Sequence, residues 1–553
     1  MSDPNAGETD AASASTAAIP TRGTGVGRAS ALLASGTIVS RILGFINGVV
    51  LAYAIGATGN GADSFALANQ LPNNVYSLVA GGLLSAVIVP QIVKAAVHLD
   101  GGQAFINKLV TLGVVVFLPV TVIATLCAPL LAALYVGPGG PDVLSLTTAF
   151  AFWCLPQIFF YALYSLIGET LNARGLFGPF TWTPALNNIV AIAGLVMFVV
   201  LFGREGHADA ASWTPEQVAV LAGSATLGIA VQAFGLLLFW RRAGLTFRPD
   251  FRWRGVGMSA TGRSAAWVFG MFLVSQASGI VEARVAAPAS GADASLAALK
   301  YAWLMFMLPH SVVTVSVITA YFTRMSAHVR DGALASVRDD LVSSLRTILM
   351  FMVFSAIGLA VLAYPFSAVF GDAQAIAPVY LAYLVGLVPW TIFFVLLRVY
   401  YAVDDTRGAF FIQVAQTAFY CAGAIALGTV VPNAWIAVAL AGWTSIALIL
   451  QALLSAFFLR RWLGGLGTLE VGQHALWYLA AAVPAAAAGI GALWLLGGIA
   501  DGAFPVSSIG GGLASMAVSG TVMAVVYAAV LWLTRNPEFR ATVEPIAARL
   551  RRR

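Results

Sequence analysis

The sequence has little charge and few cysteines. Only 9% of its 553 residues are charged, whereas 60% are hydrophobic. Soluble domains carry about 25% charged residues, so this composition excludes a water-soluble globular enzyme. The three cysteines lie far apart in apolar stretches, which argues against a disulfide framework or a zinc site and is typical of small buried side chains.

Motifs of catalysis and nucleotide binding are missing as well. The sequence contains no HExxH, no GxxxxGK[ST] phosphate loop and no GxSxG elbow, and its five histidines are scattered. It also has no lysine-rich run with interleaved aromatic residues of the kind that binds nucleic acid. We therefore expect no enzymatic activity, no cofactor or metal, no nucleic-acid partner, and no transport driven by ATP bound to this chain.

Apolar stretches of helical length follow one another from Ser30 onward. A membrane-spanning helix needs about 20 apolar residues, and these stretches lack the alternation of a transmembrane barrel. The predicted fold is an all-α polytopic membrane protein with about 14 transmembrane helices. The expected spans are 30–57, 66–97, 106–136, 143–173, 182–203, 217–241, 264–288, 295–326, 340–369, 375–402, 408–430, 433–460, 475–497 and 509–534.

Basic residues fall on alternate loops, such as the arginine-rich segment 241–254, whereas the opposite loops carry few of them. The positive-inside rule then predicts an even number of helices and both termini in the cytoplasm. Residues 1–28 carry acids where a signal peptide would carry bases, and no apolar core follows. We interpret them as a disordered cytoplasmic tail of a multi-pass protein of the inner (plasma) membrane.

Two pairs of short segments repeat at nearly one spacing. The segment at Leu71-Pro72-Asn73 resembles that at Leu308-Pro309-His310, and Arg174-Gly175 resembles Arg407-Gly408. A spacing of six helices predicts two parallel six-helix lobes, with a central cavity between them, and two further helices. The expected parts are a tail (1–28), an N-lobe (29–242), a basic cytoplasmic loop (243–263), a C-lobe (264–462), a helix pair (463–535) and a basic cytoplasmic tail (536–553).

Ionisable residues inside predicted spans are costly in a membrane and usually face a cavity. Arg41 lies about a third of the way into the first span, with apolar sequence on both sides. A guanidinium fork there can hold a diphosphate bidentately. The alternative is that Arg41 reaches the membrane surface or forms a structural pair.

For each of the other polar residues and prolines in the predicted spans, two roles are possible. Asp63 is a candidate gate residue or a plain helix cap. Glu169 is a candidate cation ligand or a packing residue, and Arg398 is a candidate gate residue or one that reaches the membrane surface. Pro72 and Pro309 are candidate bends for alternating access or static kinks.

The motifs around these residues resemble the MurJ/MviN family of lipid II flippases, which belongs to the multidrug/oligosaccharidyl-lipid/polysaccharide exporter superfamily. The pattern is similar to that of an actinobacterial branch. The resemblance covers roughly residues 30–535. It rests on Ser40-Arg41-Ile42-Leu43-Gly44-Phe45, Ala62-Asp63-Ser64-Phe65, Leu71-Pro72-Asn73, Pro184-Ala185-Leu186-Asn187-Asn188 and Tyr400-Tyr401-Ala402-Val403-Asp404-Asp405-Thr406-Arg407.

The resemblance implies a fourteen-helix fold with a cavity between two lobes and a lipid-tail groove near the last two helices. It implies lipid II, an undecaprenyl-diphosphate-linked peptidoglycan precursor, as the substrate, and Arg41, Ser40, Asn47 and Asn73 as substrate-binding residues. Charged positions of the family pattern are here Asn47, Tyr76 and neighbouring uncharged residues, so Arg41 is the main cationic cavity residue that the pattern retains.

The leading hypothesis is a flippase that moves lipid II between membrane leaflets by alternating access. Two alternatives stay open at the level of sequence. One is an exporter of another polyprenyl-linked sugar or of drugs. The other is a non-transporting scaffold that recruits cell-wall synthesis or division proteins through its arginine-rich loops. Membrane lipids are expected partners in every case.

Overall fold

A computed structural model describes residues 26–83, 102–137, 140–252 and 262–551. Every regular element in these ranges is a helix, as the composition predicts. A helix satisfies its backbone hydrogen bonds within its own segment, which is the requirement that a membrane imposes. The contacts between helices divide the chain into two compact units, Met1–Ala297 and Ala298–Arg553, and each is described by itself.

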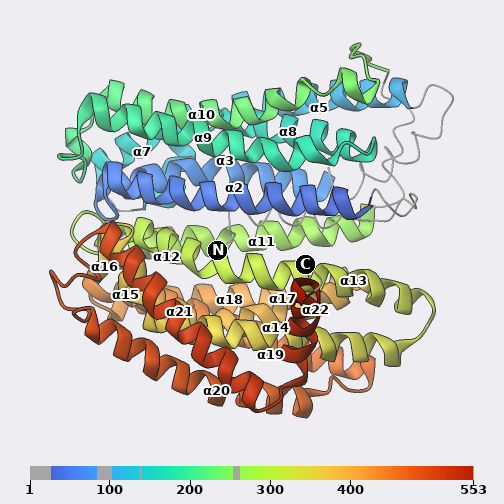
Figure 1. Ribbon diagram of the computed structural model, residues 1–553. Coiled ribbons are helices and arrows are strands. Elements are labelled where there is room, and N and C mark those ends of the chain that lie inside the picture. Colours follow the sequence, from blue (N-terminus) through green and yellow to red (C-terminus); the bar gives the residue numbers. More distant parts are fainter. Residues whose placement is uncertain (1–25, 84–101, 138–139, 253–261, 552–553) are drawn as a thin grey trace. The chain divides into compact units, whose positions relative to one another are not determined.

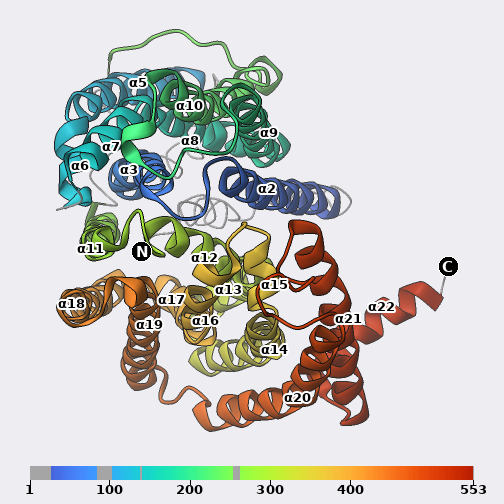
Figure 2. The same cartoon turned by 90° about the vertical axis from the view of Figure 1, so that its left-hand side faces the viewer.

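The helices of the first unit run side by side in Figure 1 and are seen nearly end-on in Figure 2. Their bounds are α2 (Val26–Ile55), α3 (Asn60–Leu83), α5 (Gln103–Leu126), α6 (Ala128–Val136), α7 (Pro141–Cys154), α8 (Gln157–Ala173), α9 (Phe177–Phe202), η2 (Ala210–Ser212), α10 (Pro215–Leu237), η3 (Arg241–Ala243), α11 (Gly262–Ala286) and η4 (Ala287–Ala289).

The helix α12 (Leu296–Pro309) begins at the end of the first unit and continues into the second. The remaining elements are η5 (His310–Thr314), a π-helical turn, followed by α13 (Val315–Arg330), α14 (Leu334–Val361), α15 (Ala363–Ala368), α16 (Ala373–Leu384), α17 (Leu387–Ala402), α18 (Thr406–Val430), α19 (Asn433–Leu463), α20 (Thr468–Leu495), α21 (Ile509–Leu533) and α22 (Pro537–Arg551).

Most of the predicted membrane spans are recovered. Within the described residues, 12 helices are long and apolar enough to cross a membrane, or 13 when α16 and α17, bent by 47°, count as one broken span. The remaining predicted span, 66–97, begins in α3 and continues into residues that lie outside the described part of the chain. The predicted all-α polytopic fold is confirmed.

The order of continuous and broken helices occurs twice along the chain. In the first unit the chain breaks at Cys127, between α5 and α6, and at Leu155, between α7 and α8. In the second unit it breaks at Leu362, between α14 and α15, and at Val385, between α16 and α17. These breaks recur at nearly the spacing of the sequence repeats, so they support a duplicated six-span plan.

Helix starts follow from local sequence. α10 begins with a capping box, in which the Thr214 N–H donates to Gln217 Oε1 at 2.8 Å and Thr214 Oγ1 accepts from the Gln217 N–H. Pro215 follows at the first helical position, where a missing N–H costs nothing. α18 is capped by Asp405, whose carboxylate accepts from the Gly408 N–H at 2.8 Å.

The most extensive helix packing in the first unit joins α2, α9 and α10. A Cβ added at Gly194 of α9 would lie 2.1 Å from the Ser224 Cβ of α10. A Cβ added at Gly228 of α10 would lie 2.9 Å from the backbone oxygen of Asn187. Glycine therefore lets these two helices meet at backbone distance, which is how apolar helices gain packing energy in lipid.

A short segment after α10 is attached to α5 by polar side chains. The Arg248 N–H donates to Asn107 Oδ1 at 3.3 Å, and the Asp250 N–H donates to Thr111 Oγ1 at 3.0 Å. Gln103, one turn earlier on α5, bonds both the N–H and the carbonyl of Thr246. The first part of the predicted basic loop 243–263 thus runs along α5.

In the second unit an ionic cluster joins α14, α20 and α22. Arg346 of α14 pairs with Glu470 of α20 at 2.7 Å and with Glu538 at the start of α22. His474 Nε2 lies 3.9 Å from the Glu538 carboxylate. Burial raises the pKa of Glu538, but its backbone hydrogen bond and Arg346 lower it more, so this pKa lies below its ordinary value of 4.5.

Large apolar side chains are exposed along the long helices of both units. Leu495 is 90% exposed and Val200 is 78% exposed, and many others exceed one half. On a soluble protein such surfaces would promote aggregation. On helices of this length they are the surfaces that face lipid.

We predict that Gly194→Ala destabilises the protein by about 1–3 kcal/mol, because the added methyl group must push α9 away from the rigid Ser224 Cβ. The measurement is thermal unfolding of the detergent-solubilised protein. Gly279→Ala is the matched control, since a Cβ at this helical glycine meets nothing within 4 Å. Equal midpoints for the two variants would contradict the proposed packing.

The lowered pKa of Glu538 predicts a stability difference that depends on pH. Its charged form stabilises the fold above pH 4.5, and this contribution is lost as the pH falls through the lowered pKa. We expect Glu538→Gln to lower the thermal midpoint at pH 7, and the midpoints of the two proteins to converge as the pH falls below the lowered pKa of Glu538. Exposed Glu544, on the same helix, is the control: Glu544→Gln should change little at either pH. A deficit of Glu538→Gln that persists in acid would refute the ionic origin.

Candidate functional site

Three predicted substrate-binding residues, Ser40, Arg41 and Asn47, lie on α2. One stripe of this helix packs on α9: a Cβ at Gly36 would lie 3.0 Å from Thr181 and Trp182, and Gly44 faces Asn188. With about 100° of rotation per residue, Ser40 and Asn47 fall on the same stripe. Both therefore lie on the side of α2 that faces α9.

Asn188 connects this stripe to α9. Its Nδ2 donates to the Ser40 carbonyl at 3.1 Å and lies 3.2 Å from the Pro184 carbonyl of its own helix. From the sequence, Asn188 was part of a family motif, and no separate role was predicted for it. The structure gives it a physical role, because an amide that bonds the backbone of a neighbouring helix fixes the rotation of α2 against α9.

Arg41 and Asn47 differ in their surroundings. Arg41 is half-buried and lies about a quarter-turn from the stripe that faces α9, between that stripe and the exposed residues Ile38 and Ile42. Asn47 has a buried Oδ1 with no hydrogen-bond partner among the described residues. A buried amide oxygen without a donor is costly, so it marks a place where a ligand or water donor would be favourable.

Asp63 has an assignable structural role. It is 6% exposed, and its Oδ1 accepts a hydrogen bond of 2.7 Å from the N–H of Ala297, in the first turn of α12. Its Oδ2 accepts from the Ser290 hydroxyl at 2.5 Å, and that hydroxyl also lies 2.8 Å from Asn60 Oδ1. Asp63 lies in the first turn of α3, yet it caps a different helix.

The neighbouring basic residue Arg284, on α11, is also held by backbone groups. Its Nε donates to the Leu134 carbonyl at 2.7 Å, and its Nη2 donates to the Ala133 carbonyl at 3.4 Å. These carbonyls belong to the last turn of α6, where a cation is favourable. Arg284 therefore binds α11 to α6.

Pro72 and Asn73 are both buried in the middle of α3, and Asn73 is 6% exposed. The adjacent Asn74 donates from its Nδ2 to the Tyr135 hydroxyl at 3.1 Å, which joins α3 to α6. α3 continues through Pro72 as one helix. Pro72 thus lies inside a helix, and its place in a membrane span and its role as a bend in transport stay predictions.

Glu169 is 8% exposed on α8 and borders an apolar core formed by α5, α8 and α10. Its carboxylate bonds the Asn172 side chain one turn later. Its Oε2 and the Asn172 Oδ1 are buried without hydrogen-bond partners among the described residues. Glu169 is therefore a buried polar group rather than a surface residue. Its role as a cation ligand or as a packing residue stays a prediction.

Pro309 ends α12, and a π-helical turn, His310–Thr314, follows it directly. His310 is 1% exposed, its Nδ1 lies 3.4 Å from Thr391 Oγ1, and its ring meets Phe394 edge-on at 4.8 Å. π-helical turns often occur at functional positions. Sequence reasoning did not single out His310, although it occupies the position of Asn73 in the second repeat.

Arg398 of α17 is also buried rather than at an open surface. It is 8% exposed, and its guanidinium carbon lies 4.6 Å from the Phe394 ring centre and 5.9 Å from that of Phe322 on α13. A guanidinium over aromatic faces is favourable where water is excluded. Arg398 thus joins α17 and α13 close to His310, with Phe394 between them.

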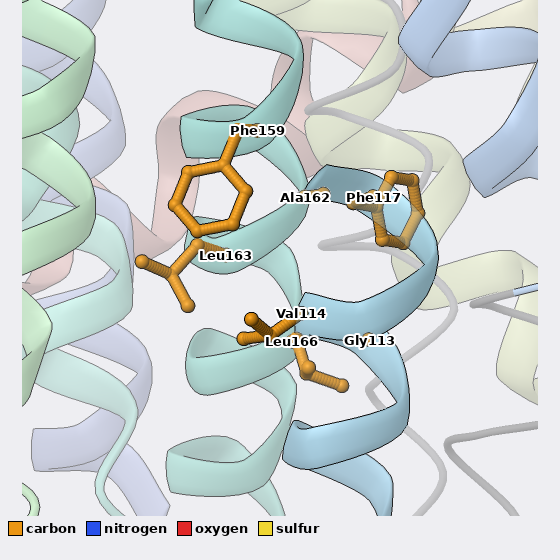
Figure 3. A pocket seen from close by; sticks show the side chains of 7 residues that line it. All are labelled: Gly113, Val114, Phe117, Phe159, Ala162, Leu163 and Leu166. Atoms are coloured by element: carbon orange, nitrogen blue, oxygen red, sulfur yellow. The ribbon is translucent and has the colours of Figure 1, made fainter. Parts of the chain in front are cut away.

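Two hollows within the first unit contain none of the predicted site residues. Figure 3 shows the first, between α5 and α8, whose lining is entirely apolar and so offers nothing to a charged headgroup: Gly113, Val114, Phe117, Phe159, Ala162, Leu163 and Leu166. The second lies between α7, η2 and the start of α10, and its lining includes Asp142, Ser145, Trp153, Trp213 and Thr214.

The contacts of Asp63 generate a test of its role. We expect Asp63→Ala to destabilise the protein by about 1–3 kcal/mol, because it leaves the Ala297 N–H without its buried acceptor, whereas the Ser290 hydroxyl keeps Asn60 Oδ1. Thermal unfolding in detergent measures this. Asp142→Ala is the control, since Asp142 is exposed in the first turn of α7 and should contribute only a few tenths of a kcal/mol. A variant at Asp63 as stable as this control would exclude the capping role.

Comparisons with known proteins point to one family. The family profile described as lipid II flippase MurJ matches residues 51–513. The chain is 28% identical over 401 residues to the probable lipid II flippase MurJ of Haemophilus influenzae, covering 67% of this chain and 75% of that protein. It is 27% identical over 516 residues to the protein of the same description from Vibrio cholerae, covering 87% and 92%.

Solved structures agree at the level of the fold. The structure described as lipid II flippase MurJ in an inward closed conformation aligns with a TM-score of 0.67 and 18% identity, covering 89% of this chain and 98% of that one. An inward-facing multidrug transporter of the MATE family aligns with a TM-score of 0.59 and 14% identity, covering 78% and 96%. The multi-pass helical fold, the repeated span order and the match over most of the chain lead to one conclusion: this protein belongs to the MurJ family of lipid II flippases, which are membrane transporters.

Proposed function

We propose that this chain moves lipid II from the inner to the outer leaflet of the inner membrane by alternating access. The observation that carries the proposal is the family match over residues 51–513. The twofold order of continuous and broken spans supports it, because a duplicated helical plan is typical of transporters that expose a central site alternately to each side. The lobes of this proposal are residues 29–242 and 264–462, with both termini in the cytoplasm.

In this mechanism Arg41 binds the diphosphate of the substrate. A guanidinium presents parallel N–H donors that match phosphate oxygens, and the attraction is strongest where water is scarce. Arg41 is half-buried in an apolar stretch of α2 and lies outside the stripe that packs on α9. These two features support a guanidinium that meets a ligand rather than only a neighbouring helix.

Polar groups on α2 and α3 supplement the charge of Arg41 in the proposal. Asn47 provides a buried amide oxygen that lacks a donor, which suits a hydroxyl or amide of the headgroup. Ser40 lies beside Arg41, and buried Asn73 on α3 provides a second amide. The Asn188 bond to the Ser40 carbonyl keeps this part of α2 in one rotation.

We propose that conformational change uses the prolines of the two repeats. Pro72 and Pro309 each remove one backbone hydrogen bond inside a helical path, which lowers the cost of bending there. The π-helical turn after Pro309 supports this role on the second repeat. Asp63, Glu169 and Arg398 act as gating or structural residues in the same scheme. Substrate binding must favour one arrangement over the other for transport to have a direction.

The test is the outward accessibility of lipid II in cells depleted of this protein and supplied with defined variants. We expect unmodified protein to restore outward lipid II. Arg41→Ala should lower transport roughly tenfold or more, since a hydrogen bond to a charged group contributes about 1.5–3 kcal/mol. Arg41→Lys, which keeps the charge but loses the fork, should fall between the two.

The matched control is the double variant Arg241→Ala and Arg242→Ala, which removes two exposed charges from the segment after α10. Immunoblots of membranes confirm equal amounts of each variant. Transport that survives Arg41→Ala but fails in the double variant would reject Arg41 as the diphosphate ligand and favour the scaffold alternative. Unchanged accessibility on depletion, without a redundant transporter, would reject the flippase proposal itself.

A further inference from the structure

The second hollow of the first unit, between α7, η2 and the start of α10, takes no part in the transport mechanism. It has a volume of about 510 Å³, which lies within the range of small-molecule sites. Its lining on α7 recurs at helical intervals, so these residues share one face of the helix: Asp142, Ser145, Leu146, Ala149, Phe152 and Trp153. Trp213, Thr214 and Val218 line the opposite side. We call this hollow the α7–α10 groove.

One end of the α7–α10 groove lies at the boundary of the membrane. Two candidate membrane spans, Pro141–Ala173 and Pro215–Ala243, begin at the groove. The span Phe177–Phe202 ends beside it, where the Phe198 ring stacks on Trp213 with 5.8 Å between the ring centres. Because two spans begin here and a third ends here, this end of the groove faces the headgroup region of a bilayer.

The groove is closed at its other end. A Cβ added at Gly223 of α10 would lie 3.4 Å from the Trp153 ring, and the Thr226 hydroxyl donates to the Trp153 carbonyl at 2.6 Å. α7 and α10 therefore meet at this level. Trp153 lies 11 positions after Asp142, which is about 16 Å along the helix. Half of the hydrocarbon layer measures about 15 Å. The groove is thus about as deep as one membrane leaflet.

The groove opens sideways to lipid and has one fixed wall. Phe152 and Trp153 are 44% and 47% exposed on a helix that forms part of a membrane span. Trp213, on the opposite wall, donates from its Nε1 to the His207 carbonyl at 3.1 Å, and its ring meets Phe150 edge-on at 5.1 Å. A wall that is already held in place costs little further order when a ligand enters.

Polarity along the groove follows the order of groups in a phospholipid. Asp142 is the outermost lining residue of α7, Ser145 lies one turn deeper, and both are exposed. Below them the lining of α7 is apolar, from Leu146 to Trp153. A carboxylate suits an ammonium group, a hydroxyl donates to a phosphate oxygen, and apolar side chains suit an acyl chain. A lipid with an amine headgroup presents these groups in the same order.

The charges around the groove select the headgroup. Asp142 is the only charged side chain among the described residues that line it, and the adjoining segment 203–217 adds three acids and one base. The base, Arg204, has partners elsewhere: its guanidinium carbon lies 3.5 Å from the Tyr53 ring centre, and its Nε donates to the Tyr53 carbonyl at 3.2 Å. An ammonium group is therefore attracted to this end of the groove, whereas a purely anionic headgroup is repelled.

We propose that the α7–α10 groove binds one phospholipid with a primary amine in its headgroup, of the phosphatidylethanolamine type. Its ammonium group pairs with Asp142, its phosphate accepts a hydrogen bond from Ser145, and one acyl chain lies along α7 as far as Trp153. With the topology proposed above, this lipid belongs to the outer leaflet. The site is separate from the residues proposed to bind lipid II, and it fills the space between α7 and α10 where these helices are apart.

The test uses the full-length protein in vesicles of phosphatidylglycerol that contain a trace of a lipid with a diazirine at the end of one acyl chain. The labelled lipid is either phosphatidylethanolamine or phosphatidylglycerol. Irradiation, digestion and mass spectrometry locate the cross-links. Asp142→Asn removes the charge with little change of shape. The matched control is Glu205→Gln, because Glu205 is an exposed acid near the same end that does not line the groove. Equal thermal midpoints confirm that each variant is folded.

We expect labelled phosphatidylethanolamine to cross-link to residues 146–153 more than labelled phosphatidylglycerol does, and excess unlabelled phosphatidylethanolamine to displace it. Asp142→Asn should lower this preference about two- to fivefold, as for an exposed ion pair, and Glu205→Gln should leave it unchanged. Equal cross-linking of both lipids would overturn the proposal, because it indicates ordinary boundary lipid. Cross-links no more frequent in the groove than at exposed Val525 of α21 would overturn it as well. Neither readout depends on transport of lipid II.

Discussion

Close contact between apolar helices is the constraint on which the rest of this structure depends. Lipid is as apolar as the helix surfaces, so burial from water does not hold such helices together, and packing and interhelical hydrogen bonds must do so. Here the contact between α9 and α10 requires glycine at Gly194 and Gly228, and the contact between α2 and α9 uses Gly36 and the Asn188 bond to the Ser40 carbonyl. These contacts fix the rotation of α2 and with it the position of Arg41.

Several polar groups in the chain serve to join elements rather than to bind substrate. Asp63 caps α12, Arg284 binds the last carbonyls of α6, and Arg346 joins three helices of the second unit. Each satisfies backbone or charged groups that would be costly if left alone. Among the predicted site residues, Asn47 and Glu169 each keep a buried oxygen to which no described residue donates a hydrogen bond. They are the natural places to search for ligand or ion contacts.

The fold was predictable to the extent that it depends on composition and periodicity. The span pattern indicated the helices, and the repeat at Pro72 and Pro309 indicated the duplication that the breaks at Cys127 and Leu362 independently support. The roles of single residues were less predictable. Asp63 was interpreted as a gate or as a cap of its own helix, but it caps α12, more than 230 positions away. A carboxylate finds such a partner only after the helices have packed, and nothing in the local sequence specifies it.

The sequence by itself determined that this chain is a helical membrane protein, its repeated segments predicted a duplicated plan, and its motifs identified the family. Hydrophobic length and backbone hydrogen bonding suffice for the first, because a membrane permits so few structures. Only the tertiary structure decided which buried polar side chains have hydrogen-bond partners among the described residues and which do not. It placed Ser40 and Asn47 on the side of α2 that faces α9, buried His310 in a π-helical turn, and set Arg398 over two aromatic rings. Those positions depend on the rotation and approach of helices distant in sequence, which packing fixes and periodicity does not.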